Sequence, residues 1–184
     1  MIRSISICSI LILISVISCT SKSGKKPSPI IDKTNCGKVI SIIDGDTYEV
    51  MFQGDSTMRV RMEGIDAPER GMPFYKRAKT YLSELCFGKK VCLKITGRDS
   101  NDRFLAYTYL EDGKELSEEM IRAGLAWHFK KYNSDTSLSK LEIEARYLKK
   151  GLWVDETPMA PWTNRSLHKQ GISTKDTFNI FGSE

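Results

Sequence analysis

The sequence predicts an α+β fold in which five strands form a small barrel with three helices. Two observations support this prediction: tight turns join the first three predicted strands, and the elements follow in the order three strands, helix, two strands, two helices. This order is typical of a five-stranded Greek-key barrel with a helix after the third strand, the OB-fold. The length of 184 residues allows one such domain with additional segments.

Alternating apolar and polar side chains mark the first three strands. Residues 37–43 are rich in Val and Ile, and residues 47–53 and 57–63 alternate with a period of two. Asp44-Gly45, between the first two strands, is a strong hairpin signal. Arg61 falls on the polar face of the third strand, close to the acidic loop that follows it.

The helices are marked by apolar residues at helical spacing. Pro73 can begin a helix that Gly88 ends. The remaining elements are expected at 90–96 and 103–110 as strands, and at 116–124 and 138–148 as helices.

Composition divides the chain into a leader at 1–19, a flexible tether at 20–34, a domain at 35–155 and a loosely ordered tail at 156–184. The leader has a basic start and an apolar run too short to span a bilayer comfortably. Its end, Val16-Ile17-Ser18-Cys19, resembles a bacterial lipoprotein processing box, which implies export and a lipid anchor to the cell envelope at Cys19. The alternative is an ordinary secretory signal with a chance cysteine.

Three cysteines fall within the predicted domain. Export implies an oxidising compartment, where disulfides persist. Cys36 begins the first strand and Cys92 lies in the fourth, and these strands are neighbours in the expected barrel, so we predict a Cys36–Cys92 bond. Cys86–Cys92 is the rival pairing. The spacings do not match a zinc site.

The composition excludes several kinds of catalytic site. The chain has two histidines, lacks a Gly-x-Ser-x-Gly elbow and lacks a phosphate-binding Gly-x-x-x-x-Gly-Lys loop. An EF-hand is also excluded, because Glu49 stands where that calcium loop requires glycine. Catalysis would therefore depend on carboxylates, arginines and a hard cation. The net charge of +5 is compatible with a polyanionic partner.

Four motifs in the expected order resemble the staphylococcal nuclease family. They are Asp44-Gly45-Asp46-Thr47, the run from Arg61 to Glu69, the run from Asp99 to Tyr107, and Gly124-Leu125-Ala126 with Gly151-Leu152-Trp153. The resemblance covers about residues 36–154. It implies the same barrel and a metal-dependent phosphodiester hydrolase.

The resemblance also implies roles for the acidic residues. Asp46 and Asp66 are expected to bind Ca²⁺, with the Ala67 carbonyl as a third ligand. Glu69 is expected to orient or deprotonate the attacking water. Oxygen ligands of this kind are those that calcium prefers.

Arg61 and Arg103 correspond to the two arginines that bind the scissile phosphate in the family, and Tyr132 to an aromatic residue beside the substrate. A planar guanidinium binds two phosphate oxygens and stays charged, which suits this task. Asp102 is adjacent to Arg103, a position from which it could compete for the guanidinium. Lys130 could bind nucleic acid or be an ordinary surface charge. Phe129 could stack against a base or pack in the core.

The resemblance implies a calcium-dependent endonuclease that hydrolyses both DNA and RNA, favours single strands and leaves 3′-phosphate ends. Low sequence specificity follows if its contacts are mainly to phosphate. We expect a monomer attached to a membrane by its lipid. The alternative is a non-catalytic nucleic-acid-binding or adhesive surface lipoprotein on the same fold.

Overall fold

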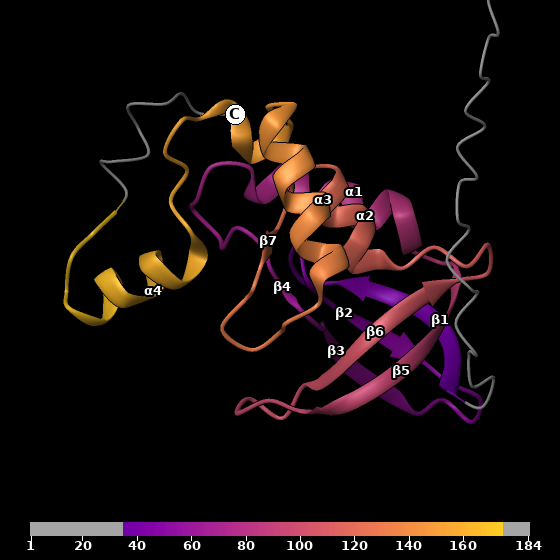
Figure 1. The fold of residues 1–184 in the computed structure, drawn as a ribbon. Helices are drawn as coiled ribbons and strands as arrows, with labels where there is room; N and C mark the ends of the chain where they lie inside the picture. Colours follow the sequence, from indigo (N-terminus) through magenta and orange to yellow (C-terminus); the bar gives the residue numbers. More distant parts are fainter. Residues whose placement is uncertain (1–34, 175–184) are drawn as a thin grey trace, which may run out of the picture.

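The computed structural model describes residues 35–174 (Figure 1). The predicted leader with Cys19 and the tether at 20–34 lie outside the described residues, as does the chain beyond residue 174. Within the described range, no helix has the length and apolar character needed to cross a bilayer.

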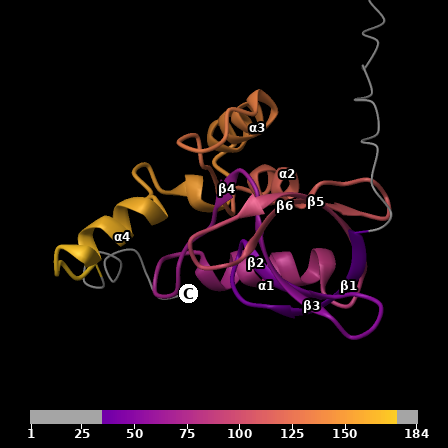
Figure 2. The same cartoon turned by 90° about the horizontal axis from the view of Figure 1, so that it is seen from below.

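Five strands close into a barrel in the order β1-β2-β3-β6-β5, as predicted (Figure 2). Their bounds are β1 (Cys36–Ile42), β2 (Thr47–Met51), β3 (Thr57–Met62), β5 (Lys90–Arg98) and β6 (Phe104–Leu110). Neighbouring strands are antiparallel, except that β3 and β6 run parallel. Closing the sheet leaves no open edge along the barrel wall.

A second, two-stranded sheet was not predicted. It pairs β4 (Ile65–Asp66) with β7 (Trp127–His128) in antiparallel register, so that Asp66 lies opposite Trp127. Strands of two residues are too short to show a periodic pattern. This pairing fixes Asp66 against the segment that follows the second helix.

The described residues contain four α-helices, where three were predicted. They are α1 (Tyr75–Cys86), α2 (Leu116–Arg122), α3 (Thr136–Tyr147) and α4 (Pro161–Lys169), and the 3₁₀ helix η2 (Gly151–Val154) lies between the last two. Figures 1 and 2 both place α4 outside the barrel.

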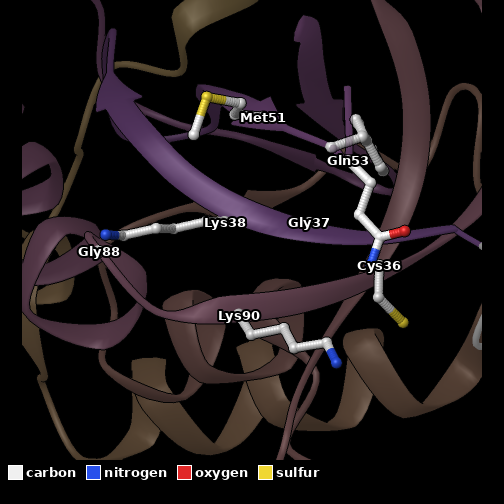
Figure 3. Close-up of a pocket in the computed structure, with 8 residues that line it drawn as sticks. Cys36, Gly37, Lys38, Met51, Gln53, Gly88 and Lys90 are labelled. Carbon is white, nitrogen blue, oxygen red and sulfur yellow. The ribbon is translucent and has the colours of Figure 1, made fainter. Parts of the chain in front are cut away.

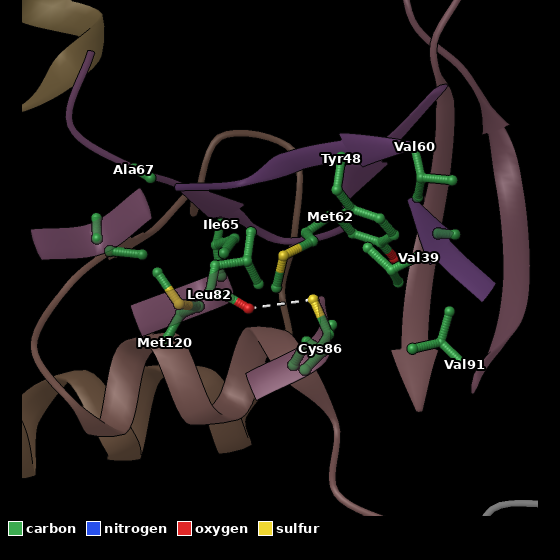
Figure 4. Close-up of a cluster of buried hydrophobic side chains, with 14 of the residues drawn as sticks. Val39, Tyr48, Val60, Met62, Ile65, Ala67, Leu82, Cys86, Val91 and Met120 are labelled. Atoms are coloured by element: carbon green, nitrogen blue, oxygen red, sulfur yellow. Dashed lines mark hydrogen bonds between the residues drawn. The ribbon is translucent and has the colours of Figure 1, made fainter. Parts of the chain in front are cut away.

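The core fills the barrel and the space between it and the helices (Figure 4). Tyr48 and Val60 point inward from neighbouring strands, and Leu82 of α1 and Met120 of α2 meet them from outside; all four are fully buried. The hydroxyl of Tyr48 hydrogen-bonds the hydroxyl of Thr108, which satisfies its polar end inside the apolar core.

Cys36 and Cys92 form a disulfide in the structure, with Cα atoms 4.0 Å apart on paired strands. The rival partner, Cys86, has a free thiol, which donates to the Leu82 carbonyl (Figure 4). Burial raises the pKa of the Cys86 thiol to about 12, so the neutral thiol persists at neutral pH. A cavity of about 780 Å³ lies beside Cys36, and none of the described residues that line it is acidic. Figure 3 shows its lining residues.

The prediction of a loosely ordered tail at 156–184 is wrong for α4. Pro161 occupies the first turn of this helix, where its missing N–H is no loss, and both Pro161 and Asn164 are buried. Trp162 stacks on Phe129 with ring centroids 5.4 Å apart. A nine-residue polar helix has little stability of its own, so these contacts hold it in place.

Candidate active site

A cavity of about 1370 Å³ opens where the loops of the barrel meet α4. Its walls come from the β1–β2 turn, the ends of β3 and β4, the loop before β6 and the loop after β7. The residues predicted for the site from the sequence all line this cavity: Asp46, Arg61, Asp66, Ala67, Glu69, Arg103 and Tyr132. Segments far apart in the chain therefore converge as the sequence motifs implied.

The β1–β2 turn packs tightly because Gly45 lacks a side chain. A Cβ at this position would lie 2.8 Å from the Cβ atoms of both Ala67 and Ala78, closer than such atoms approach in proteins. The turn therefore lies against Ala67, the residue that follows β4, and the Ala67 N–H donates to Oδ2 of Asp46 at 2.9 Å. Glycine in the Asp-Gly-Asp motif thus brings Asp46 into the cavity.

Arg61 lies between the two predicted metal ligands. Its Nη1 is 2.8 Å from Oδ1 of Asp46, and its Nη2 is 3.0 Å from Oδ1 of Asp66. Burial acts to lower the pKa of Arg61, but these two carboxylates raise it above its ordinary value. One guanidinium therefore holds two buried carboxylates in the same part of the cavity.

The carboxylates of the cavity differ in their affinity for a proton. Burial acts to raise the pKa of Asp46, but Arg61 and the Ala67 N–H together hold it below its ordinary value. Burial raises the pKa of Asp66, and the charge of Asp46 adds to this effect, so that the paired arginines do not offset it fully.

Asp44, read from the sequence as an ordinary hairpin residue, also belongs to this cluster. Its Oδ1 accepts the N–H of Asp46 at 3.1 Å. Burial raises the pKa of Asp44 to about 6, and the negative charge of Asp46 acts in the same direction. Negative charges are therefore crowded on this side of the cavity.

Arg103 approaches the acidic cluster through a hydroxyl group. Its Nη1 lies 3.3 Å from Oγ1 of Thr47, which in turn donates to Oδ1 of Asp46 at 2.9 Å. The parallel register of β3 and β6 pairs Arg61 with the residue two places after Arg103, so the two arginines reach the same cavity.

Asp99, and not the adjacent Asp102, is the carboxylate that binds Arg103. Oδ2 of Asp99 lies 2.7 Å from Nε and 2.6 Å from Nη2 of Arg103. Asp102 pairs instead with Arg98. The competition for Arg103 that the sequence allowed for Asp102 does not occur, because Asp102 has a positive φ of 58° in a tight turn that Asp99 closes with its own side chain.

Glu69 is held by two residues of α4. Its Oε1 lies 2.6 Å from Nη1 of Arg165, and its Oε2 accepts Nδ2 of Asn164 at 3.3 Å. Arg165 also places its Nη2 2.6 Å from Oδ2 of Asp66. A third guanidinium therefore enters the cavity, beside the two that were predicted.

The sequence analysis missed Arg165 because it expected a loose tail around it. The signal that was present is Pro161 followed by nine residues without glycine, which is compatible with a short helix. It does not indicate where such a helix would pack.

The donor groups fit a hard cation in chemical kind. Within residues 35–174, no three or more Asp, Glu, His or Cys side chains converge as a ready-made metal site. Asp46 and Asp66 nevertheless supply two buried carboxylates whose charges repel each other, and Ala67 adds a backbone carbonyl. Oxygen donors of this type suit Ca²⁺, whose ligands in proteins are carboxylate and carbonyl oxygens together with water.

Tyr132 lies at the rim of the cavity on the loop after β7. Its side chain is 70% exposed and meets Phe129 edge-on, with ring centroids 5.0 Å apart. The loop is fixed by Asn133, which is buried and donates to the Tyr107 hydroxyl at 2.8 Å. An exposed aromatic ring on a fixed loop can stack against a base.

Comparisons with known proteins give a consistent result. A family model described as "Staphylococcal nuclease homologue" matches residues 59–155. An Escherichia coli protein named "Uncharacterized endonuclease" is 37% identical over 134 residues, which is 73% of this chain and 87% of that protein. A Haemophilus influenzae protein of the same name is 33% identical over 159 residues, which is 86% of this chain and 83% of that protein.

A plant relative extends the comparison. The rice protein named "Probable staphylococcal-like nuclease CAN2" is 33% identical over 155 residues, which is 82% of this chain and 41% of that protein. The family model covers Arg61, Asp66, Glu69 and Arg103, whereas Asp46 and α4 lie outside the span it matches.

Proposed function

Because this chain belongs to the staphylococcal nuclease family, we propose that it is a calcium-dependent endonuclease acting on both DNA and RNA. We propose that it cleaves with low sequence specificity and leaves 3′-phosphate ends. One observation carries the proposal: Arg61 contacts both Asp46 and Asp66. Arg103 approaches Asp46 as well, through the hydroxyl of Thr47.

The two arginines bind the substrate phosphate and stabilise its developing charge. A phosphodiester is already negative, and more charge gathers on its oxygens as water attacks. Preorganised guanidiniums in a partly enclosed cavity neutralise that charge without reorganising. The side chain of Arg61 is 13% exposed and that of Arg103 is 22% exposed, so both are largely shielded from water.

Glu69 holds and deprotonates the attacking water. Its carboxylate is one-third exposed, which leaves it within reach of solvent, and Arg165 and Asn164 fix its orientation. The contribution of Glu69 is to position the water and to accept its proton.

Asp46, Asp66 and the Ala67 carbonyl are the groups that would hold the calcium ion. When bound, it would supply a positive charge beside the scissile phosphate and make water more acidic. Low sequence specificity follows because the proposed contacts are to phosphate, which every nucleotide carries.

A cleavage assay with a matched pair of variants tests the proposal. The purified protein is incubated with 5′-labelled single-stranded DNA or RNA in calcium or in chelator, and half of each sample is then treated with phosphatase. We expect fragments only with calcium, and a change in their gel mobility after phosphatase, because a 3′-phosphate is removed.

Arg61→Ala and Arg59→Ala provide the comparison. They lie two places apart on β3, but Arg59 pairs with the exposed strand residue Glu49 and does not line the cavity. Loss of cleavage in Arg61→Ala, with cleavage retained in Arg59→Ala, supports the proposal. If the unmodified protein slows the migration of the nucleic acid in a gel but produces no fragments, the result would instead indicate a non-catalytic binding module.

We also propose that the protein is exported and anchored to the cell envelope through a lipid on Cys19. The proposal rests on the sequence of the leader and the processing box. Replacing Cys19 with Ser should move the protein from the membrane fraction to the soluble fraction. An unchanged distribution between the fractions would contradict a lipid anchor.

A further inference from the structure

A second cavity of about 660 Å³ adjoins the proposed reaction site. It lies between the loop after β7, one face of α3, and α4. Four residues line both cavities: Phe129, Tyr132, Arg165 and Lys169. A chain molecule bound in the reaction site would therefore reach the second cavity by passing over these four residues.

Aromatic rings form one side of this second cavity. Phe129 and Trp162 are stacked, with their planes inclined by 12°. Tyr132 meets Phe129 edge-on, and the side chains of Tyr132 and Trp162 remain 70% and 37% exposed. Exposed aromatic surface beside a polar cavity is a platform on which nucleic-acid bases stack.

Positive charge dominates the remaining lining. The cationic lining residues are Lys130, Lys131, Arg146, Arg165 and Lys169, and the lining contains one carboxylate, Glu142. Glu142 is buried and pairs with Lys130 and Arg146. Among residues 35–174, neither Lys131 nor Lys169 takes part in an ion pair, so both can bind phosphate.

We propose that this cavity is a flanking subsite, which binds the nucleotides of a single strand that extend beyond the scissile phosphate. The proposal rests on the nuclease function proposed above and adds to it a second binding surface, to which α4 contributes Trp162, Arg165 and Lys169. Stacking requires bases whose faces are accessible, which a duplex does not offer. The cations meanwhile follow the backbone, as in other single-strand binding grooves.

Trp162, Arg165 and Lys169 belong to α4, outside the 59–155 span that the family model matches. The flanking subsite is therefore formed by α4 as well as by the part of the chain that the family model matches. Trp162 connects the helix to the loop, and Lys169 places a charge at the boundary of the two cavities.

Binding measurements on two variants test the flanking subsite. Fluorescence anisotropy is recorded in chelator, which prevents cleavage, with a labelled oligothymidine of ~12 nucleotides and one of ~3 nucleotides, because single-strand sites span ~4–16 nucleotides. We expect Trp162→Ala to weaken binding of the long oligonucleotide by roughly fivefold or more, and to leave the short one unchanged. Lys169→Ala should lower the slope of log affinity against log salt by about one.

Tyr147→Ala and Lys140→Ala are matched controls. Both residues are exposed on α3 and line neither cavity. Trp162→Phe, which keeps a stacking ring, should retain most of the affinity, and Lys169→Ala decides the question if Trp162→Ala fails to fold.

Unchanged long-oligonucleotide affinity and salt slope in folded Trp162→Ala and Lys169→Ala would overturn the flanking subsite. That result leaves the nuclease proposal intact if the unmodified protein cleaves in calcium. Conversely, absence of cleavage would refute the nuclease proposal, while the binding data in chelator still decide the subsite.

Discussion

Arg165 places its Nη2 2.6 Å from Oδ2 of Asp66, although 99 residues separate them in the chain. The same guanidinium contacts Glu69, so α4 neutralises charge in the middle of the acidic cluster. Burial acts to lower the pKa of Arg165, but these two carboxylates raise it. Arg165 and a divalent cation would therefore compete for the same oxygens.

We expect Arg165→Ala to bind calcium more tightly. Without the guanidinium, the Asp66 oxygens are available to a cation, and loss of charge-assisted contacts of this kind corresponds to roughly a tenfold change in affinity. Calorimetric titration of calcium in the absence of nucleic acid measures the effect, with Arg59→Ala as the control. Weaker calcium binding in Arg165→Ala would show that Arg165 supports the site instead of competing for it.

Arg61→Ala and Arg103→Ala should both lower kcat by about 10²-fold or more, because each removes a phosphate ligand. Their effects on stability should differ. Arg61 compensates two buried carboxylates, so its loss should lower the free energy of unfolding by roughly 3–5 kcal/mol. Arg103 pairs with one carboxylate, Asp99, which is only partly buried, and we expect a smaller loss of about 1 kcal/mol. Urea unfolding distinguishes them, and equal destabilisation would contradict the central position of Arg61.

Glu69→Gln should lower kcat by about 10²–10⁴-fold while leaving nucleic-acid affinity nearly unchanged. The amide keeps the shape of the side chain but cannot accept the proton of the attacking water. Single-turnover cleavage and anisotropy measure the two quantities separately. Glu156→Gln, on the exposed surface, is the matched control. If Glu69→Gln turned over at the rate of the unmodified protein, Glu69 would have no role in the reaction.

Glu115 should make stability fall as pH rises. Burial raises its folded-state pKa to about 7 from an ordinary value of 4.5, although three backbone N–H groups oppose the shift. The folded state therefore holds this proton more tightly. The resulting stabilisation is complete below pH 4.5 and is lost as pH rises to about 7.

Comparison of Glu115→Gln with the unmodified protein isolates this contribution. Between these pH values, the unfolding free energy of the unmodified protein should fall by about 1–3 kcal/mol more than that of the variant. Urea titrations at several pH values provide the measurement, again with Glu156→Gln as control. An identical pH slope in Glu115→Gln would assign the dependence to other groups, such as Asp44.

Replacing Cys36 and Cys92 together with serine should lower the free energy of unfolding by about 2–4 kcal/mol, because the crosslink closes a long loop across the barrel. A reducing agent should destabilise the unmodified protein by a similar amount and leave the double variant unaffected. Equal sensitivity of both proteins to the reductant would contradict this bond as the source of the stabilisation.

Much of the barrel and the site was accessible to sequence reasoning. Strand alternation and Asp-Gly turns are local properties, and they located all five barrel strands. Asp46, Arg61 and Asp66 lie within or directly beside these strands, so the fold class was enough to bring them together. The partner of Arg103 was not accessible in this way, because turn geometry determines whether Asp99 or Asp102 faces it.

The sequence by itself thus determined the barrel, the pairing of Cys36 with Cys92, and the seven predicted residues that line the main cavity. The tertiary structure alone decided that α4 packs beside that cavity and sends Arg165 into it. The physical reason is that a short polar helix has almost no local signal or intrinsic stability. Its position depends on Trp162 meeting Phe129 and on Asn164 and Arg165 meeting Glu69, contacts that exist only once the barrel has formed.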